Sequence, residues 1–326
     1  NRMYIDADGT DGENIDSVRS QLKWVNRLRT CLETGDFEMH FQPIIPKDKH
    51  HRPLFEALLR IYDEEGNVGS PAIYIDAAEH FGLIQQLDMA VVNRCFETQH
   101  KLAQDGVDVD FSINLSSRSL GDREVMESLR NLLKEYDIDP NRIMFEVTET
   151  MALHDPAALR DVGEIHAFIN ELRGMGFRFA IDDFGAGFTS FQYIRLLPVD
   201  VVKIDGTYIK DLENNKEDRI FIESMAMLCR GLNIKTIAEF VENEAIVKIL
   251  DDIGIDYAQG WHLGKPQADI VSNQQKYYGK VLMDFVDQEK IKTLPKKRIT
   301  KNKAKPKTVA AKSKPRKTKK AVKKAV

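Results

Sequence analysis

The chain contains 326 residues, of which 42% are hydrophobic and 30% are charged, and its formal net charge is −4. These proportions are typical of soluble globular proteins, and the length fits one large barrel or two ordinary domains. No apolar run is long enough to cross a bilayer and the three scattered cysteines show no pairing pattern, which argues against a spanning helix, a disulfide framework and a cysteine-based zinc site.

The N-terminal residues are polar. Residues 1–20 are rich in Asp, Gly and Asn, which predicts a linker. After them, apolar residues at a spacing of three and four, among them Leu22, Val25 and Leu28, predict a helix that ends near Gly35. We therefore place the start of the folded domain at residue 21.

Short β-rich runs then alternate with amphipathic helical stretches. The predicted strands cover residues 38–45, 54–61, 109–115, 143–147, 178–181, 201–204, 236–240 and 257–260. The predicted helices cover residues 72–81, 89–104, 124–136, 156–175, 218–232 and 242–253. Repeated strand–helix alternation indicates a parallel sheet with helices outside it.

Eight strands over about 240 residues predict an α/β fold, a closed (β/α)8 TIM-like barrel. Only a short polar loop, residues 46–53, separates the first two strands. They are therefore expected to pair as a hairpin, which gives the barrel an irregular, antiparallel first strand. A doubly wound open sheet is the alternative. The folded domain is predicted to end at residue 285.

The C-terminal segment differs in charge from the rest of the chain. Residues 296–326 contain fifteen Lys and Arg and no Asp or Glu, which leaves 32 of the 47 basic residues and all 51 acidic residues in the first 295 positions. Residues 286–326 also contain too few large apolar side chains to fold alone. They are predicted to form a disordered, Lys-rich tail that binds nucleic acid or an anionic membrane surface weakly.

Polar side chains recur in or just after the predicted strands. They are Glu56, Asn114, Glu146, Glu149, Asp182, Asp183, Lys203, Glu239, Glu242 and Gln259. A buried acid is costly unless it is paired, and the C-terminal ends of barrel strands converge on the face where barrel active sites form. Taken singly, such an acid is more often a surface residue or a helix cap. The ordered set indicates one polar site.

The residue types favour metal chemistry at phosphorus. Oxygen ligands without Cys or His favour Mg²⁺ or Mn²⁺ over zinc. The adjacent Asp182 and Asp183 could let one carboxylate bridge two ions while the other binds the second, and two ions favour in-line attack at phosphorus. Lys203 is the one cation of the set and would hold the attacking water or stabilise phosphoryl charge.

These residues lie in motifs that resemble the EAL domain family of cyclic di-GMP phosphodiesterases. The similarity runs from Phe37 to Pro266. In order, the motifs are Phe41-Gln42-Pro43-Ile44, Glu56-Ala57-Leu58-Leu59-Arg60, Asn114-Leu115-Ser116, Glu146-Val147-Thr148-Glu149, Asp182-Asp183-Phe184-Gly185-Ala186-Gly187, Lys203-Ile204-Asp205, Glu239-Phe240-Val241-Glu242 and Gln259-Gly260. The resemblance implies that cyclic di-GMP is hydrolysed to linear pGpG in bacterial second-messenger signalling.

The resemblance also implies a role for each residue. One metal ion would be held by Glu56, Asn114, Glu146 and Asp182, and the second by Asp182, Asp183 and Glu239. Lys203 would contact the nucleophilic water, and catalysis would depend on Lys203, Glu239 and Glu242. The substrate would be bound through Gln42 at a guanine, Arg60 at a phosphate, and Gln259. Glu149 would brace the loop at 183–190, which in the family couples the metal site to dimerisation.

Two functions from different classes remain open. The first is an active phosphodiesterase, and the second is a receptor that binds cyclic di-GMP without cleaving it. Receptors that resemble this family usually lack a metal or catalytic residue, and the motifs above lack none, which favours the enzyme.

The resemblance implies a homodimer as well. Asn1-Arg2-Met3-Tyr4 resembles the end of a diguanylate cyclase (GGDEF) domain, so an upstream GGDEF or sensor domain is expected. The sparse, unpaired cysteines favour a cytoplasmic location, and a membrane-anchored upstream region is left open.

Overall fold

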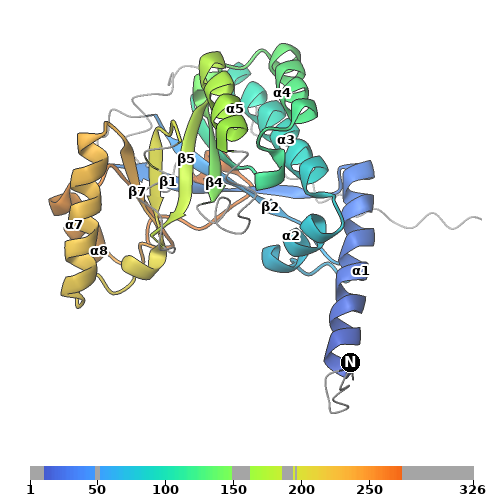
Figure 1. The fold of residues 1–326 in the computed structure, drawn as a ribbon, viewed down its shortest axis with the longest axis horizontal. Helices are drawn as coiled ribbons and strands as arrows, with labels where there is room; N and C mark the ends of the chain where they lie inside the picture. Colours follow the sequence, from blue (N-terminus) through green and yellow to red (C-terminus); the bar gives the residue numbers. More distant parts are fainter. Residues whose placement is uncertain (1–10, 48–51, 149–161, 186–193, 195–196, 274–326) are drawn as a thin grey trace, which may run out of the picture.

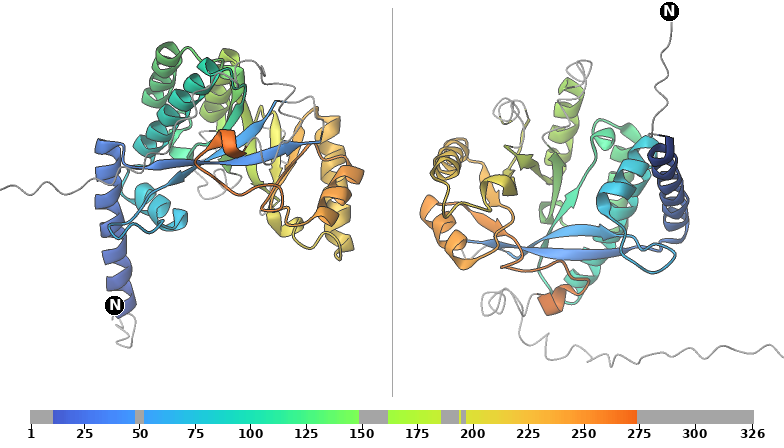
Figure 2. Two further views of the ribbon diagram at one scale, coloured as in Figure 1. Left: turned by 180° about the vertical axis from the view of Figure 1, so that it is seen from behind. Right: turned by 90° about the horizontal axis from the view of Figure 1, so that it is seen from below.

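The computed structural model describes residues 11–47, 52–148, 162–185, 194 and 197–273. Eight strands close into a single barrel in sequence order, with helices around its outside (Figures 1 and 2). The strands are β1 (Glu38–Pro46), β2 (Leu54–Arg60), β3 (Asp110–Asn114), β4 (Ile143–Thr148), β5 (Arg178–Phe184), β6 (Val201–Ile204), β7 (Lys235–Ala238) and β8 (Tyr257–Gln259). The closed barrel confirms the predicted (β/α)8 fold, and the open doubly wound sheet is wrong.

Strand β1 runs antiparallel to both of its neighbours. It pairs Gln42 with Glu56 on β2 and Ile44 with Gln259 on β8. All other neighbouring strands are parallel. This pairing confirms the irregular first strand and brings Gln42 level with Glu56.

Helices lie between most of the parallel strands, and others flank the barrel in the chain. The helices between strands are α2 (Pro71–His80), α3 (Ile84–Gln104), α4 (Arg123–Tyr136), α5 (Val162–Met175), α7 (Lys216–Gly231) and α8 (Glu244–Ile253). Helix α1 (Asp11–Thr34) precedes β1, and the short helix α9 (Ile270–Asn273) follows β8. Short 3-10 turns in the described residues include η1 (Ser117–Ser119), η2 (Pro140–Arg142) and η5 (Gly206–Tyr208). Residues 156–161 of the predicted helix 156–175 lie outside the described residues.

The predicted linker over residues 1–20 is wrong for its second half. Helix α1 already begins at Asp11 and projects away from the barrel at its N-terminal end (Figure 1). The Asp, Gly and Asn content, here Asp11, Gly12 and Asn14, made this stretch resemble a linker. Acids also stabilise the first turns of a helix by interacting with the helix dipole, so the same composition suits a helix start.

Side-chain caps set several helix ends. Asp122, Asn215 and Asn243 accept hydrogen bonds from backbone N–H groups in the first turns of α4, α7 and α8. Because Asn243 is the cap, α8 begins at Glu244 instead of the predicted residue 242. At its other end, Gly254 takes the left-handed conformation that terminates a helix, with φ of 87°.

The inside of the barrel is built in layers. At the N-terminal end of the strands, Asp110 of β3 pairs with Arg178 of β5 at 2.8 Å and with Arg52 at 3.0 Å. Since β3 and β5 are not neighbours, this ion pair spans the interior. Above it lies a small apolar layer of Ile44, Leu54, Met144, Ala180, Val201 and Ile237. The larger apolar core packs strands such as β4 against the helices.

Two sequence predictions concern residues outside the described part of the chain. The predicted disordered tail, residues 286–326, lies outside it, as does the predicted end of the domain at residue 285. Both stay predictions. Among the residues that the structure describes, no helix has the length and apolar character that crossing a membrane requires.

Candidate active site

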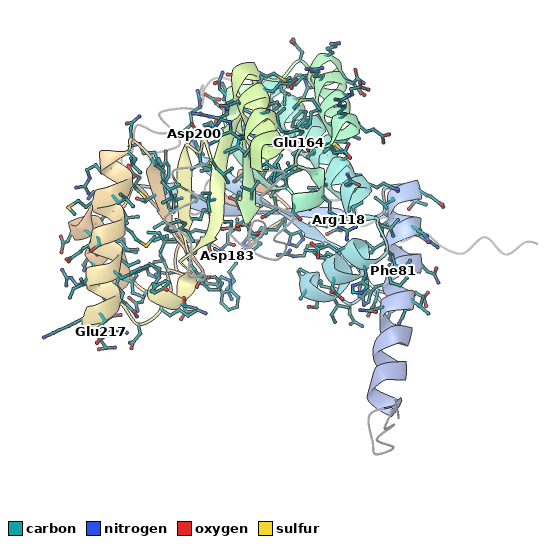
Figure 3. All side chains as sticks on the ribbon, viewed as in Figure 1. Phe81, Arg118, Glu164, Asp183, Asp200 and Glu217 are labelled. Atoms are coloured by element: carbon teal, nitrogen blue, oxygen red, sulfur yellow. The ribbon has the colours of Figure 1, made fainter. Side chains whose placement is uncertain are left out.

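A polar layer lies directly above the apolar layer of the barrel. Because strand side chains alternate between faces, the residue two positions after an inward apolar residue also faces inward. The corresponding pairs are Leu54 and Glu56, Met144 and Glu146, Ala180 and Asp182, Val201 and Lys203, and Ile237 and Glu239. Figure 3 shows Asp183 at the C-terminal end of β5 and Asp200 at the opposite end of the barrel. The polar layer is therefore at the C-terminal end.

Lys203 occupies the centre of this layer, with a side chain only 1% exposed. Its Nζ atom is 2.8 Å from Glu146 Oε2, 2.8 Å from Glu239 Oε1, 2.9 Å from Asp182 Oδ1 and 3.8 Å from Glu56 Oε2. Burial by itself would lower the pKa of Lys203, but the four carboxylates raise this pKa well above its ordinary value. Lys203 is thus a fully charged ammonium group that balances part of the acidic charge.

Neutral side chains hold two of these carboxylates in place. Asn114 Nδ2 donates to Glu56 Oε1 at 3.0 Å, and Gln259 Nε2 donates to Glu56 Oε2 at 2.5 Å. The buried hydroxyl of Ser112 donates to Glu146 Oε1. Such outer hydrogen bonds fix the orientation of ligand groups. Sequence reasoning missed Ser112, although its spacing of two from Asn114 on β3 signals a second inward polar residue.

Three carboxylates form the group best placed for a cation. Oxygen atoms of Asp182, Asp183 and Glu239 lie within 4.8 Å of one another. Burial, with the neighbouring Asp182 charge, raises the pKa of Asp183 to about 6, and burial raises the pKa of Glu239 to about 7. Burial is the main cause of both shifts and the neighbouring carboxylates add to them, so a cation bound here would stabilise the ionised groups.

Two further atoms support a metal site. Asp182 Oδ1 is buried and accepts no hydrogen bond, although it lies 2.9 Å from Lys203 Nζ, and Gln259 Oε1 is buried without a donor. The surrounding side chains offer oxygen atoms, the ligands that Mg²⁺ and Mn²⁺ prefer. The residues present therefore fit such an ion.

The end of β5 has an irregular backbone that brings both aspartates to this site. Adjacent strand residues normally point to opposite faces. Here the register between β5 and β6 shifts between Ile181 and Phe184, and Asp183 adopts a left-handed backbone with φ of 54°. This turn lets the Asp183 carboxylate lie beside that of Asp182.

A cavity of about 460 Å³ opens next to the polar layer. It is lined by Gln42, Glu56, Leu58, Arg60, Asp182, Asp183, Lys203, Lys210, Glu239, Phe240, Glu242, Gln259, Gly260, Trp261 and Pro266. The Phe240 and Trp261 side chains are 49% and 66% exposed. Lys210 Nζ lies 4.4 Å from the centre of the Phe240 ring. Exposed rings and cations around a cavity suit a ligand with planar bases and negative charge.

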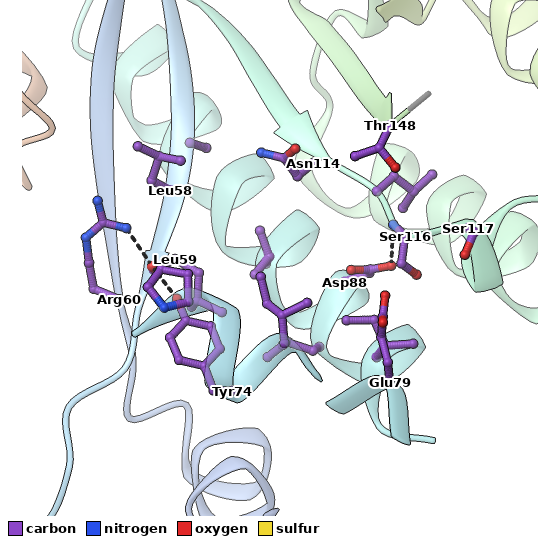
Figure 4. Close-up of a pocket in the computed structure, with 17 residues that line it drawn as sticks. Leu58, Leu59, Arg60, Tyr74, Glu79, Asp88, Asn114, Ser116, Ser117 and Thr148 are labelled. Carbon is purple, nitrogen blue, oxygen red and sulfur yellow. Dashed lines mark hydrogen bonds between the residues drawn. The ribbon is translucent and has the colours of Figure 1, made fainter. Parts of the chain in front are cut away.

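A second cavity of about 450 Å³, whose lining residues are drawn in Figure 4, shares Leu58 and Arg60 with the first. The Arg60 guanidinium donates to the Leu59 carbonyl at 2.9 Å, which holds the side chain between the two cavities. On the far wall, Asp88 accepts a hydrogen bond from the Ser116 backbone N–H at 2.9 Å.

Most residues of the predicted site converge in the structure. The polar layer contains Glu56, Asn114, Glu146, Asp182, Asp183, Lys203, Glu239 and Gln259. Gln42 lines the cavity, and its side-chain amide donates to the Gly264 carbonyl at 3.1 Å. Arg60 and Glu242 line the cavity as well. Glu149 lies outside the described residues, so its predicted role is untested.

Sequence reasoning also missed Lys210 and Asp88 as lining residues and gave Phe240 no role. Phe240 directly follows the motif residue Glu239, and an aromatic side chain at a barrel strand end was an available signal. Lys210 lies two residues after η5 and Asp88 lies on α3, and the strand pattern gives no information about these connecting segments.

The sequence profile of the EAL domain family matches residues 25–266. The chain therefore belongs to the EAL domain family. It is 38% identical over 266 residues to the cyclic di-GMP phosphodiesterase PdeB of Shewanella oneidensis, covering 81% of this chain and 30% of the relative. It is 30% identical over 249 residues to the probable cyclic di-GMP phosphodiesterase PdeA of Escherichia coli, covering 76% of this chain and 33% of the relative. The chain thus spans about a third of these relatives.

Solved structures show the same architecture. The EAL domain of FimX from Pseudomonas aeruginosa, bound to c-di-GMP, aligns with a TM-score of 0.68 at 26% identity, covering 76% of this chain and 97% of that domain. The PaMucR phosphodiesterase in its c-di-GMP complex aligns with a TM-score of 0.67 at 30% identity, covering 76% of this chain and 99% of that structure.

Proposed function

We propose that this EAL domain hydrolyses cyclic di-GMP to linear pGpG in bacterial second-messenger signalling. The observation that carries the proposal is the Lys203 ammonium, which lies within 4 Å of four carboxylates next to an open cavity. Family membership and the names of the relatives support the choice of substrate.

We propose that Mg²⁺ or Mn²⁺ binds here, as two ions. Glu56, Asn114, Glu146 and Asp182 would hold one ion, and Asp182, Asp183 and Glu239 the other. Bound ions supply activation of a water molecule and neutralisation of charge on the phosphoryl group. The buried Asp182 Oδ1 supports this assignment, because it accepts no hydrogen bond and its only polar contact among the described residues is the ion pair with Lys203.

The protein's own residues would orient the reactants. Lys203 Nζ is held by carboxylates on several strands, so it can keep a donor fixed toward the attacking water while charge develops on phosphorus. Gln259 fixes the Glu56 carboxylate by a hydrogen bond of 2.5 Å. Glu242 lines the cavity and would support the substrate and the ions from that side.

The two adjoining cavities offer a way to bind a cyclic dinucleotide. Arg60 lies between them, where its guanidinium would contact a phosphate of the central ring. One base would enter the first cavity near Gln42 and the exposed Phe240 ring. The other would enter the second cavity, where the Asp88 carboxylate is of the type that accepts guanine N–H groups.

The alternative is a receptor that binds cyclic di-GMP without cleaving it. The two functions predict the same binding and differ in the fate of the ligand. Incubating the purified chain with cyclic di-GMP and Mg²⁺ or Mn²⁺, followed by chromatography of the nucleotides, separates them. We expect pGpG. Saturable binding in which cyclic di-GMP is recovered intact with either ion would favour the receptor.

Other parts of the proposal concern partners and location. We propose a cytoplasmic homodimer that works downstream of a GGDEF or sensor domain, with Glu149 supporting the loop at 183–190. The length of the relatives, about three times that of the matched part, supports further domains.

We also propose that the basic segment at 286–326 binds nucleic acid or anionic membranes weakly. Fifteen of its Lys and Arg residues lie within 296–326, where the sequence has no aromatic residue that could stack on bases. Binding that depends on counterion release falls steeply with salt. DNA and anionic-vesicle binding at several salt concentrations tests this, and binding that is insensitive to salt would contradict it.

A further inference from the structure

The end of β5 has an unusual backbone that surrounding contacts help to hold. Asp183 has φ of 54° and Gly185 has φ of 102°. Both values lie in the left-handed region, which an aspartate occupies only at a cost. Such a backbone persists when surrounding contacts determine it, so the contacts around Gly185 decide where the Asp183 carboxylate lies.

Tyr208 makes two of these contacts. Its hydroxyl donates a hydrogen bond to the Gly185 carbonyl at 2.7 Å. The Tyr208 ring also packs closely against Gly185. A Cβ atom added to Gly185 would lie only 2.9 Å from Tyr208 Cε2. One side chain thus fixes the turn by a polar and a steric contact.

Tyr208 is itself held rigidly. Its ring stacks on Phe221 of α7, with ring centres 4.4 Å apart and an angle of 25° between the planes. Its backbone N–H donates to the Asp205 carbonyl at 3.3 Å, and the Asp205 N–H donates to the Phe184 carbonyl at 3.2 Å. The turn η5 therefore connects the end of β5 to α7, outside the cavity.

We propose that Tyr208 is a positioning residue for the metal site: its hydroxyl holds the left-handed turn that directs the Asp183 carboxylate toward Asp182 and Glu239. Tyr208 is not among the residues that line the cavity, so it acts through Asp183 and touches neither the substrate nor the ions. This inference rests on the proposed metal-dependent function.

The test measures metal binding without substrate. Tyr208→Phe keeps the stacked ring and removes only the hydroxyl. Mn²⁺ affinity, measured by calorimetry or by the electron paramagnetic resonance signal of free Mn²⁺, is expected to fall about tenfold, the lower end of the effect of losing an outer hydrogen bond. Tyr136→Phe is the matched control. It removes a tyrosine hydroxyl on α4 that donates to Asn93 Oδ1 on α3 at 2.9 Å.

A double-mutant cycle distinguishes positioning from a general loss of stability. If Tyr208 acts through Asp183, adding Tyr208→Phe to Asp183→Asn changes Mn²⁺ binding no further. Melting temperatures of all variants show whether each one folds.

Unchanged Mn²⁺ affinity in folded Tyr208→Phe, or an additional loss in the Asp183→Asn background, would overturn the inference while leaving the proposed function intact. Absence of Mn²⁺ binding by the unmutated protein would overturn the proposed metal dependence, and the inference with it.

Discussion

At the scale of single residues, the balance of charge around Lys203 controls the site. One ammonium group faces four carboxylates, so the layer keeps a negative excess that burial makes costly. Burial raises the pKa values of Asp183 and Glu239 to about 6 and about 7, and the neighbouring carboxylates add to both shifts. The layer is therefore built to receive further positive charge.

Replacing Lys203 separates chemistry from binding. In Lys203→Met the candidate metal ligands remain, so cyclic di-GMP should bind with a Kd within a few fold of the unmutated value. Loss of a preorganised donor should lower kcat about a hundredfold to a thousandfold. Steady-state kinetics and calorimetric binding give both quantities. A strongly weakened Kd with preserved kcat would make Lys203 a substrate anchor instead.

Removing candidate ligands should act on turnover directly. Asp182→Ala and Glu56→Ala should each nearly abolish pGpG formation, and Asp182→Ala should be more severe because Asp182 is proposed to bridge both ions. Initial rates over a range of Mn²⁺ concentrations measure the difference. Glu127→Ala, which removes an exposed acid on α4, is the control and should keep full activity. Substantial turnover by Asp182→Ala would refute the bridging role.

The affinity for metal ions should depend on pH in the range of the raised pKa values of Asp183 and Glu239. Protonated carboxylates are poor ligands, so metal binding must release protons from Asp183 and Glu239. Because the pKa values of these groups are about 6 and about 7, Mg²⁺ affinity should rise as pH increases through this range and level off above it. Calorimetric titrations in buffers of different ionisation enthalpy count the released protons. Affinity that is independent of pH would contradict the assignment.

At the scale of elements, close backbone contacts between strand ends shape the cavity. Gly260 follows β8, and a Cβ at this position would lie 2.1 Å from the Val241 carbonyl oxygen and 2.2 Å from the Val241 nitrogen. Because both atoms are backbone, neither can rotate away. The end of β8 and the segment after β7 can therefore approach only with glycine at this position.

Substituting this glycine tests the contact. Gly260→Ala should lower the free energy of unfolding by about 1–3 kcal/mol, the usual cost of overpacking a buried position. Gly174→Ala, on α5 with open space around the added Cβ, should instead stabilise the protein by about 0.5–1 kcal/mol. Urea unfolding measures both. Equal stability of the two variants would show that the strand ends move apart easily.

The barrel strands could be predicted because short β-rich runs alternate with amphipathic helical stretches. The polar layer could be predicted because residues such as Glu56 and Glu146 recur in or just after those runs. What could not be predicted depends on contacts between distant segments. The hydrogen bond from Tyr208 to Gly185 joins two loops, and the four-carboxylate environment of Lys203 requires knowing which side chains meet across the barrel. The start of α1 was missed because acidic residues suit both linkers and helix starts.

At the scale of the whole molecule, the acidic barrel and the basic segment are separate in charge and composition. Residues from Lys296 onward include almost no large apolar side chains, so their removal should leave the core intact. We expect the chain truncated before Lys296 to melt within a few degrees of the full chain. A large drop in melting temperature would show that the basic segment docks on the acidic barrel.

The lysine–carboxylate centre is proposed to be the catalytic site of a metal-dependent phosphodiesterase. The most direct measurement strips the purified protein of metal with a chelator, adds cyclic di-GMP, and follows pGpG after Mg²⁺, Mn²⁺ or Ca²⁺ is restored. We predict pGpG with Mg²⁺ or Mn²⁺ and none with Ca²⁺, whose larger radius and looser coordination fit an octahedral site poorly. Cyclic di-GMP that stays bound and intact with Mg²⁺ and Mn²⁺, or cleavage without any divalent ion, would contradict the account.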